Sequence, residues 1–224
     1  MRLPRTAQRS SRKPCAVPAQ KGEPVSREKK TGASDFRGLP LILASTSPRR
    51  RDLLTEAGYR FEVIPADVNE ITPVHFTVSE TVLFNAKVKA EEVAQRRSDA
   101  LVIGADTLVA LEGNALGKPR DLCEAFEMLS QLSGREHEVF SGVWLACLAG
   151  KQLSLGFVEV SRVRFRKLSA KEIREYMTRI NPLDKAGAYA AQEDPMGIIA
   201  GIEGSRTNVI GLPMEALSAA LRRL

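Results

Sequence analysis

Cysteine, histidine and aromatic residues are scarce in this chain of 224 residues, and each scarcity excludes a class of protein. The 3 cysteines lie far apart, at Cys15, Cys123 and Cys147, whereas a disulfide framework or a zinc site needs more of them at closer spacing. We therefore expect reduced thiols in a cytoplasmic protein. The aromatic share of 5% is also too low for the stacking surface of a protein that binds single-stranded nucleic acid.

Long apolar runs and the motifs of serine hydrolases are absent as well. No apolar run reaches the roughly 18 residues of a membrane span, and residues 1–30 lack the apolar core of a secretory signal. We therefore expect no membrane association. The pattern Gly-x-Ser-x-Gly does not occur, and the only histidines are His75 and His137. His137 lies at the start of a predicted strand, where a structural role is the expected one.

The net charge of +6 is concentrated at the N-terminus. Residues 1–38 hold ten Lys and Arg against three Asp and Glu, so residues 39–224 carry about one net negative charge. A nucleic-acid-binding face needs basic residues gathered on a folded surface, and we expect no stable nucleic-acid complex. Prolines and a lack of apolar residues predict that residues 1–38 form a basic, disordered extension. The same segment also resembles an organelle transit peptide, an alternative that its four prolines weaken.

From residue 39 onward, apolar patterns predict strands that alternate with helices. The predicted strands are 41–44, 59–65, 100–111, 138–148, 152–166 and 198–202. The predicted helices are 48–57, 78–95, 121–132, 169–178 and 213–221. This order predicts an α/β domain over 39–224 with flanking helices. Its sheet should be mixed, because two of the strands form a hairpin that turns near Gly150.

A polar loop, Ser45–Arg51, lies between the first predicted strand and the first predicted helix. Ser47 is expected to cap that helix, whose free N–H groups suit a phosphate. The hydroxyl of Ser45 and the guanidinium groups of Arg49 and Arg50 add donors for the same ligand. The alternative is a capped helix whose arginines are solvated.

Asp106 interrupts an apolar stretch, residues 102–109, that otherwise predicts a buried strand. A carboxylate in such a place has to be paired with a cation. The partner is either an internal Arg or Lys, which makes Asp106 structural, or a metal ion, which makes it a ligand or a proton acceptor.

Two further motifs carry weaker signals. Gly117-Lys118-Pro119 does not match a P-loop, because the glycine spacing is one residue short and Pro119 replaces the Ser or Thr that holds Mg²⁺. Lys118 is still placed to face a phosphate. In Leu183–Gln192, small residues follow charged ones, and Gln192 could pair with a base edge. A tight structural turn is the alternative for that segment.

Taken in order, these segments resemble the Maf family of nucleoside triphosphate pyrophosphatases. Six collinear segments carry the resemblance: Leu41–Leu54 (LILASTSPRRRDLL), Gly104–Val109 (GADTLV), Gly117–Asp121 (GKPRD), Leu132–Val143 (LSGREHEVFSGV), Leu183–Gln192 (LDKAGAYAAQ) and Ile202–Pro213 (IEGSRTNVIGLP). The resemblance covers residues 39–224. It implies a twisted mixed sheet in two lobes around a deep cleft. It also implies cleavage of a nucleoside triphosphate between the α- and β-phosphates with a divalent cation, Mg²⁺ or Mn²⁺.

The resemblance further implies roles for individual residues. Asp106 would accept a proton and, together with Glu70, hold the metal. The residues expected to contact the phosphates are Ser45, Ser47, Arg50, Lys87 and Lys118. Arg49, Thr107 and Gln192 are typical of the branch that resembles dTTP/UTP pyrophosphatases.

The expected substrate is therefore dTTP or UTP, with modified pyrimidine triphosphates as further candidates. The alternatives are 7-methyl-GTP or another base, or a regulator of cell division that binds nucleotide without catalysis. Three positions depart from the family pattern. Asn69 replaces an Asp and so removes a possible charge from the metal site, and Ser141 replaces a Thr, which is a mild change. Glu193-Asp194 adds two negative charges after Gln192, and this departure bears on base preference more than on the reaction. A homodimer is among the expected assemblies.

Overall fold

The computed structural model describes residues 38–148 and 152–224, and the statements below concern these residues. The extension predicted over residues 1–38 lies outside them apart from Gly38, and so does the predicted turn at Gly150. No helix in the two described ranges is both long and apolar enough to span a lipid bilayer.

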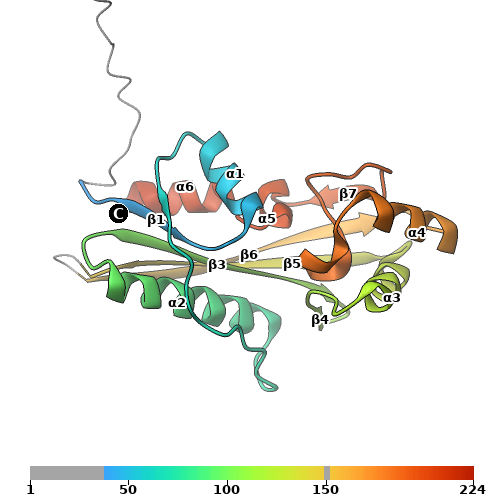
Figure 1. The fold of residues 1–224 in the computed structure, drawn as a ribbon, viewed down its shortest axis with the longest axis horizontal. Coiled ribbons are helices and arrows are strands. Elements are labelled where there is room, and N and C mark those ends of the chain that lie inside the picture. Colours follow the sequence, from blue (N-terminus) through green and yellow to red (C-terminus); the bar gives the residue numbers. More distant parts are fainter. Residues whose placement is uncertain (1–37, 149–151) are drawn as a thin grey trace, which may run out of the picture. The chain divides into compact units, whose positions relative to one another are not determined.

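A mixed β-sheet organises the described residues (Figure 1). Its strands are β1 (Leu41–Ala44), β2 (Glu62–Val63), β3 (Leu101–Leu111), β4 (Asn114–Leu116), β5 (Glu136–Cys147), β6 (Leu153–Phe165) and β7 (Ile199–Glu203). The strand order is β2–β1–β3–β5–β6–β7, and the short β4 pairs with the far part of β3. β1 runs parallel to both of its neighbours, whereas the pairs from β3 to β7 are antiparallel.

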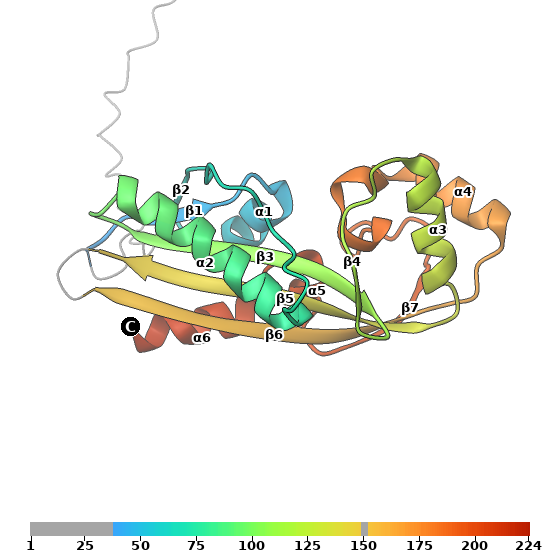
Figure 2. The same cartoon turned by 90° about the horizontal axis from the view of Figure 1, so that it is seen from below.

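The first half of the sheet has helices on both faces (Figures 1 and 2). The α-helices are α1 (Pro48–Glu56), α2 (Val78–Arg96), α3 (Leu122–Leu132), α4 (Ala170–Arg179), α5 (Arg206–Ile210) and α6 (Met214–Arg223). α2 covers one face, and α1 and α6 cover the other. The alternation of side chains along β1 accounts for this arrangement, because Ile42 packs with α2 whereas Leu41 and Leu43 pack with α1 and α6.

A second core lies at the far end of the sheet, where β3, β5 and β6 continue beyond α2. Val109, Val139 and Phe165 of these strands pack there with Leu129 of α3 and Tyr176 of α4. The same three strands therefore run through both cores. The expected α/β class, with a mixed sheet and flanking helices, is confirmed.

Two glycines allow α2 to lie directly on the sheet. A Cβ atom at Gly104 of β3 would come within 2.1 Å of the Ala86 carbonyl oxygen, and one at Gly142 of β5 within 2.4 Å of the Val82 carbonyl oxygen. A larger residue cannot occupy either position without moving the helix backbone. This contact brings the buried face of α2 next to Asp106.

The predicted elements agree with the structure except for the short ones. β2 spans two residues, whereas the sequence predicts a strand over 59–65. β4, α5 and the 3-10 turns η1 (Pro182–Asp184) and η2 (Ala186–Ala188) are not predicted, because they have too few residues for an apolar period. β4 follows a two-residue turn, where φ angles of 52° at Glu112 and 80° at Gly113 reverse the chain.

Candidate active site

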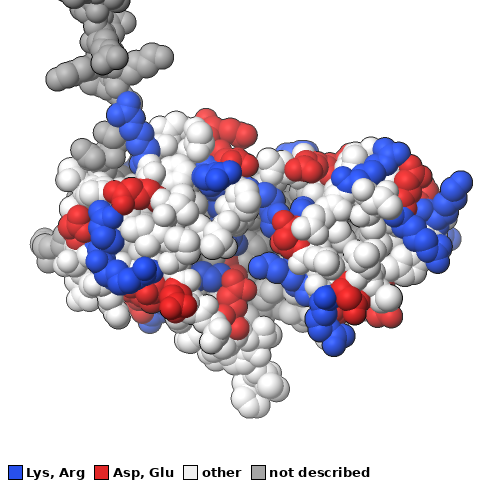
Figure 3. Space-filling view, viewed as in Figure 1, with Lys and Arg blue, Asp and Glu red and all other residues white. Residues whose placement is uncertain are grey.

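A cleft of about 720 Å³ lies between the two cores. β1 pairs with β3 as far as Gly104, and β4 pairs with β3 from Val109 onward. No strand of the described ranges pairs with residues 105–108 on that edge, and Asp106 and Thr107 lie there in the cleft lining. Figure 3 shows charged side chains of both signs around the hollow.

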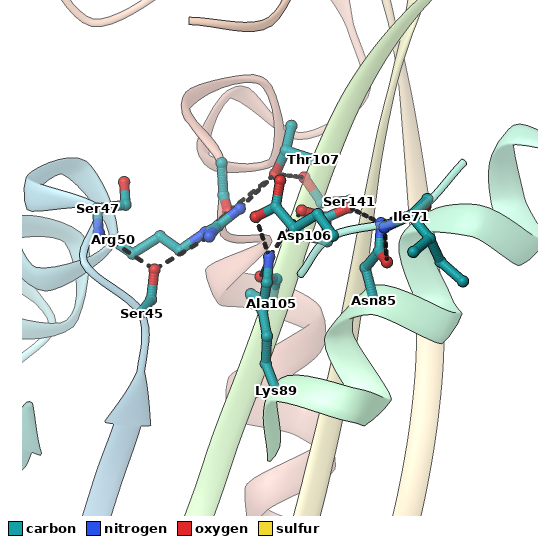
Figure 4. Close-up of polar contacts among 12 residues, drawn as sticks. Ser45, Ser47, Arg50, Ile71, Asn85, Lys89, Ala105, Asp106, Thr107 and Ser141 are labelled. Atoms are coloured by element: carbon teal, nitrogen blue, oxygen red, sulfur yellow. Dashed lines mark hydrogen bonds and ion pairs between the residues drawn. The ribbon is translucent and has the colours of Figure 1, made fainter. Parts of the chain in front are cut away.

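Asp106 is a buried carboxylate held by two donors from α2 (Figure 4). Lys89 Nζ donates to its Oδ1 at 2.9 Å, and Asn85 Nδ2 donates to its Oδ2 at 3.0 Å. Lys89 Nζ also donates to Glu70 Oε1 at 2.6 Å, so that one ammonium group lies between two carboxylates. Asp106 thus has the internal lysine partner that the sequence leaves open, and it also faces a cleft.

Glu70 is half-exposed and forms part of the cleft lining. Burial by itself raises the pKa of Glu70, but the charge and the hydrogen bond of Lys89, with smaller contributions from Lys118 and Arg50, bring this pKa below its ordinary value. Glu70 is therefore ionised at neutral pH, with Lys89 as its cationic partner.

A second polar network connects the loop after β1 with β3 and the segment before α6. The buried guanidinium of Arg50 donates to the Gly211 carbonyl at 2.8 Å and to Ser45 Oγ at 3.1 Å. It also donates to Thr107 Oγ1 at 3.0 Å. Thr107 Oγ1 in turn lies 2.9 Å from Ser141 Oγ on the neighbouring strand β5. These contacts fix the orientation of Arg50 in the cleft lining.

Arg50 keeps its positive charge despite its burial. Burial lowers its pKa, and the negative charges of Asp106 and Glu70 oppose that shift. Arginine stays protonated in proteins because its pKa starts above 12. A buried guanidinium next to a solvent-filled cleft gains from an anionic ligand, since the ligand replaces lost hydration.

The start of α1 adds further donors. Ser47 is the N-cap residue, as predicted, but its side chain makes no capping hydrogen bond. Its hydroxyl is therefore available to a ligand beside the free N–H groups of the first helical turn. Gly58, with a φ of 80°, lies just beyond the end of the helix.

Three further basic side chains, from three different chain segments, line the same cleft: Arg49, Lys118 and Lys185. Arg49 Nη1 donates to Asp184 Oδ2 at 3.3 Å, and Nη2 donates to the Asp184 carbonyl at 3.2 Å. Lys185 Nζ donates to Asp184 Oδ1 at 2.6 Å. Lys118 is exposed at the same cleft. The Arg49–Asp184 pair joins residues 135 positions apart in the sequence.

The cleft has two chemically different ends. The charged end contains Ser45, Arg50, Glu70, Lys89, Asp106 and Lys118. The apolar end contains Val109, Val139, Tyr189, Ala190, Val209 and Ile210. A polyphosphate with its counter-ion suits the first end, and a flat heterocycle suits the second.

The family described as Maf-like protein matches residues 40–224 of this chain. The chain is 46% identical over 183 residues to the dTTP/UTP pyrophosphatase of Pelotomaculum thermopropionicum, and the alignment covers 82% of this chain and 95% of that relative. This chain belongs to the Maf family. The dTTP/UTP pyrophosphatase of Myxococcus xanthus is 47% identical over 184 residues, which cover 82% of this chain and 91% of the relative. The solved structure of the Staphylococcus aureus Ham1 protein is 18% identical, with a TM-score of 0.47 and coverage of 82% and 98%.

In this Maf-family chain, Lys89 and not Lys87 reaches the cleft. The sequence-based set places Lys87 among the phosphate contacts, but the structure places its ammonium 5.2 Å from the centre of the Trp144 ring and 3.9 Å from Glu91. Two helical positions differ by about 200° around the helix axis, so the two lysines point in different directions. The predicted apolar face of α2 was the available signal, because Lys89 follows Ala86 by three positions.

Gln192 also lies away from the other predicted specificity residues. Ala191 is part of the cleft lining, whereas Gln192 is exposed and lies outside that lining. The chain bends after Ala191, which turns the next side chain outward. Arg49 and Thr107 do line the cleft, and so do Ser45, Ser47, Arg50, Glu70, Asp106 and Lys118.

The donor set of the charged end fits a divalent cation that arrives with a triphosphate. The described residues contain no group of three or more His, Cys, Asp or Glu side chains that could hold a metal alone. Mg²⁺ in nucleotide sites commonly takes one or two carboxylates and completes its coordination with substrate phosphates and water. Glu70 and Asp106 are the two carboxylates of this end that could hold such a cation, and in this structure Lys89 Nζ lies between them.

Proposed function

We propose that this Maf-family chain is a nucleoside triphosphate pyrophosphatase that hydrolyses dTTP and UTP to the monophosphate and pyrophosphate. The observation that carries the proposal is the cluster of Asp106, Lys89 and Glu70 in the cleft, beside the buried guanidinium of Arg50. The two relatives that are 46% and 47% identical to this chain are both named dTTP/UTP pyrophosphatase, which supports the proposal.

The charged end would bind the triphosphate. Ser45, Ser47 and the first turn of α1 supply neutral donors, and Arg50 supplies a fixed positive charge. Lys118 lies at the surface of the cleft, where it would contact the outer phosphates. These contacts would hold the triphosphate in one orientation next to Asp106. A fixed orientation of the reacting groups lowers the activation barrier of hydrolysis.

Asp106 would take the proton from the attacking water. Water oxygen adds to the α-phosphorus, the bond from that phosphorus to the bridging oxygen breaks, and pyrophosphate leaves with that oxygen. Asn85 and Lys89 hold the two carboxylate oxygens of Asp106 in place before substrate arrives. A divalent cation, Mg²⁺ or Mn²⁺, held by Glu70 and Asp106 would neutralise the charge on the phosphate oxygens.

Arg49 and Thr107 would contribute to base preference in different ways. Thr107 Oγ1 contacts Arg50, Ser141 and the Gly211 carbonyl, so it acts by shaping the lining. Arg49 is partly exposed and held by Asp184, so its donors can be exchanged between Asp184 and a ligand. The exposed Gln192 would need a movement of its segment to reach a base.

A substrate panel tests the proposal. Purified protein with Mg²⁺ or Mn²⁺ is incubated with dTTP, UTP, 7-methyl-GTP, GTP and ATP, and the released pyrophosphate and orthophosphate are measured separately. We expect pyrophosphate, with kcat/KM highest for dTTP and UTP. Preference for 7-methyl-GTP or a purine would overturn the substrate assignment. Binding of nucleotide without turnover would instead support a regulator, and release of orthophosphate would refute the proposed bond.

The cytoplasmic location and the homodimer stay predictions. Cell fractionation tests the first, and sedimentation of the purified chain tests the second.

A further inference from the structure

One wall of the apolar end of the cleft has no function in the phosphate chemistry proposed above. This wall is the segment Ala186–Ala191, in which every side chain except Tyr189 is a methyl group or a hydrogen. Tyr189, Ala190 and Ala191 belong to the cleft lining and are almost fully buried. The small side chains leave the room in front of the wall free for a ligand.

Three hydrogen bonds connect the backbone of this wall to other parts of the chain. The N–H of Gly187 donates to the Gly117 carbonyl at 3.0 Å, and the N–H of Ala190 donates to Tyr176 Oη at 3.1 Å. Arg206 Nη2 donates to the Ala191 carbonyl at 3.1 Å. The anchors come from the loop after β4, from α4 and from α5, so the wall is fixed from several sides.

Two consecutive residues of the wall adopt left-handed backbone angles. Gly187 has a φ of 67° and Ala188 a φ of 62°. For alanine this conformation is unfavourable, and it persists only where the surroundings determine it. Strained backbone of this kind is concentrated at ligand-binding sites, where it positions the neighbouring side chain. The neighbouring side chain here is Tyr189.

Tyr189 contacts a buried histidine and a phenylalanine of the second core. His137 Nε2 and Tyr189 Oη lie 3.0 Å apart. The rings of His137, Phe165 and Tyr189 meet edge to face, with centroid distances of 4.9 Å, 5.3 Å and 4.9 Å. Aromatic pairs of this geometry stabilise one another beyond simple burial. The ring of Tyr189 therefore has one orientation relative to the cleft.

His137 takes part through its hydrogen bond and its ring, and not through a charge. Burial lowers the pKa of His137 to about 4, so the imidazole is neutral at pH 7. It belongs to the second core, packed with Phe165, and it is not part of the cleft lining. Tyr189 is the cleft-lining residue that its ring contacts.

We propose that Tyr189 is the surface against which the pyrimidine base packs, and that His137 is the positioning residue that sets the orientation of Tyr189. The inference rests on the proposed function, because it requires a ligand with a charged polyphosphate and a flat base. The two ends of the cleft match these two parts, and the wall of small residues leaves space for a base beside the tyrosine ring.

The test compares Tyr189→Phe, His137→Phe and His137→Gln with the wild type. The first two variants remove the hydrogen bond and keep an aromatic ring, whereas the glutamine side chain in His137→Gln would keep an N–H group close to the place of the imidazole Nε2. Tyr59→Phe is the matched control, because it also removes a tyrosine hydrogen bond, 3.1 Å long to Ser218, but lies outside the cleft lining. Inorganic tripolyphosphate, which has no base, serves as a competitive inhibitor that reports on the charged end.

We expect Tyr189→Phe and His137→Phe to raise KM for dTTP about three- to tenfold, with a smaller change in kcat, because one buried hydrogen bond is lost. Inhibition by tripolyphosphate should stay within twofold of the wild type. His137→Gln should recover most of the KM, and Tyr59→Phe should leave KM unchanged. An unchanged KM in both ring-preserving variants, with only a lower Tm, would overturn the inference. An equal weakening of tripolyphosphate inhibition would overturn it as well.

Failure of the proposed function would look different. It would appear as absence of wild-type turnover on the panel, whatever the variants do. The Kd of dTTP, measured by calorimetry on the wild type and the same four variants, would then decide the role of Tyr189 without catalysis. A Kd that the Tyr189 and His137 variants leave unchanged would refute the inference in that case too.

Discussion

The two ends of the cleft are held in place by different means. At the charged end, side chains fix side chains: Lys89 and Asn85 hold Asp106, and Ser45 and Thr107 hold Arg50. At the apolar end, the backbone is fixed first, by hydrogen bonds to the peptide groups of residues 187–191, and the side chains follow. Substitutions that remove a single charge should therefore impair the charged end most. The apolar end should be impaired most by substitutions that weaken its backbone hydrogen bonds or the packing of its core.

The largest expected effect is at the charged end. Asp106→Asn should lower kcat for dTTP by about 10²- to 10⁴-fold, because the variant cannot accept a proton from water. The fold should persist, since Lys89 keeps Glu70 as its partner. Steady-state kinetics and circular dichroism measure the two quantities. The control is Asp99→Asn, which removes an exposed carboxylate paired with Arg97. Full activity of Asp106→Asn would refute its assigned role.

A pH titration of stability tests the apolar end. The pKa of His137 is about 4 in the folded protein and about 6.5 when unfolded. The unfolded chain therefore binds a proton that the folded chain excludes, and the free energy of unfolding falls as the pH falls from about 6.5 to about 4. This one group accounts for about 3 kcal/mol of that loss. Denaturant unfolding at several pH values should show a shallower fall in His137→Gln than in the wild type. Identical slopes would mean that His137 is not buried in its neutral form.

Two lysines of α2 allow a comparison within one helix. Lys89→Gln should lower kcat/KM about tenfold or more, because it removes a charge-assisted hydrogen bond to Asp106. Lys87→Gln should change kcat/KM less than twofold, because Lys87 faces Trp144 and Glu91. Kinetics on dTTP below the Tm of both variants measures the difference. If Lys87→Gln proved the more damaging change, the cleft would have to rearrange on binding.

The smallest expected effect concerns the basic segment before the domain. A chain without residues 1–37 should keep kcat/KM for dTTP within twofold, since the charged end is complete within residues 45–118. A larger loss would mean that the positive charges of that segment contribute to binding the triphosphate. The same assay on both chains at higher ionic strength checks for such a contribution, because salt weakens interactions between exposed charges more than those between buried ones.

Local patterns were sufficient to predict most of the fold and part of the site. Asp106 stood out because it is a carboxylate inside an apolar strand, and Ser47 because it precedes a helix that begins with proline. The predicted site included Lys87, since its short motif alone does not say which helical face meets the sheet. The apolar period of α2 contains that information and places Lys89 on the buried side.

Long-range partners could not be predicted in this way. Arg49 and Asp184 are 135 positions apart, and His137 and Tyr189 are 52 positions apart. Their contacts follow from the places that α1, β5 and the segment after α4 take in the fold, and local sequence patterns carry no signal for such pairs. The exposed position of Gln192 has the same origin, because it depends on a bend that no local residue preference determines.

The three strands β3, β5 and β6 run without a break beneath both ends of the cleft. Opening such a cleft by rotating one core away from the other would require all three hydrogen-bonded strands to bend together. Substrate can then be admitted by the movement of side chains at the edge of the cleft, for example when Arg49 breaks its hydrogen bond to Asp184. Substrate entry should accordingly depend on ionic strength, because salt weakens the exposed ion pair that has to open.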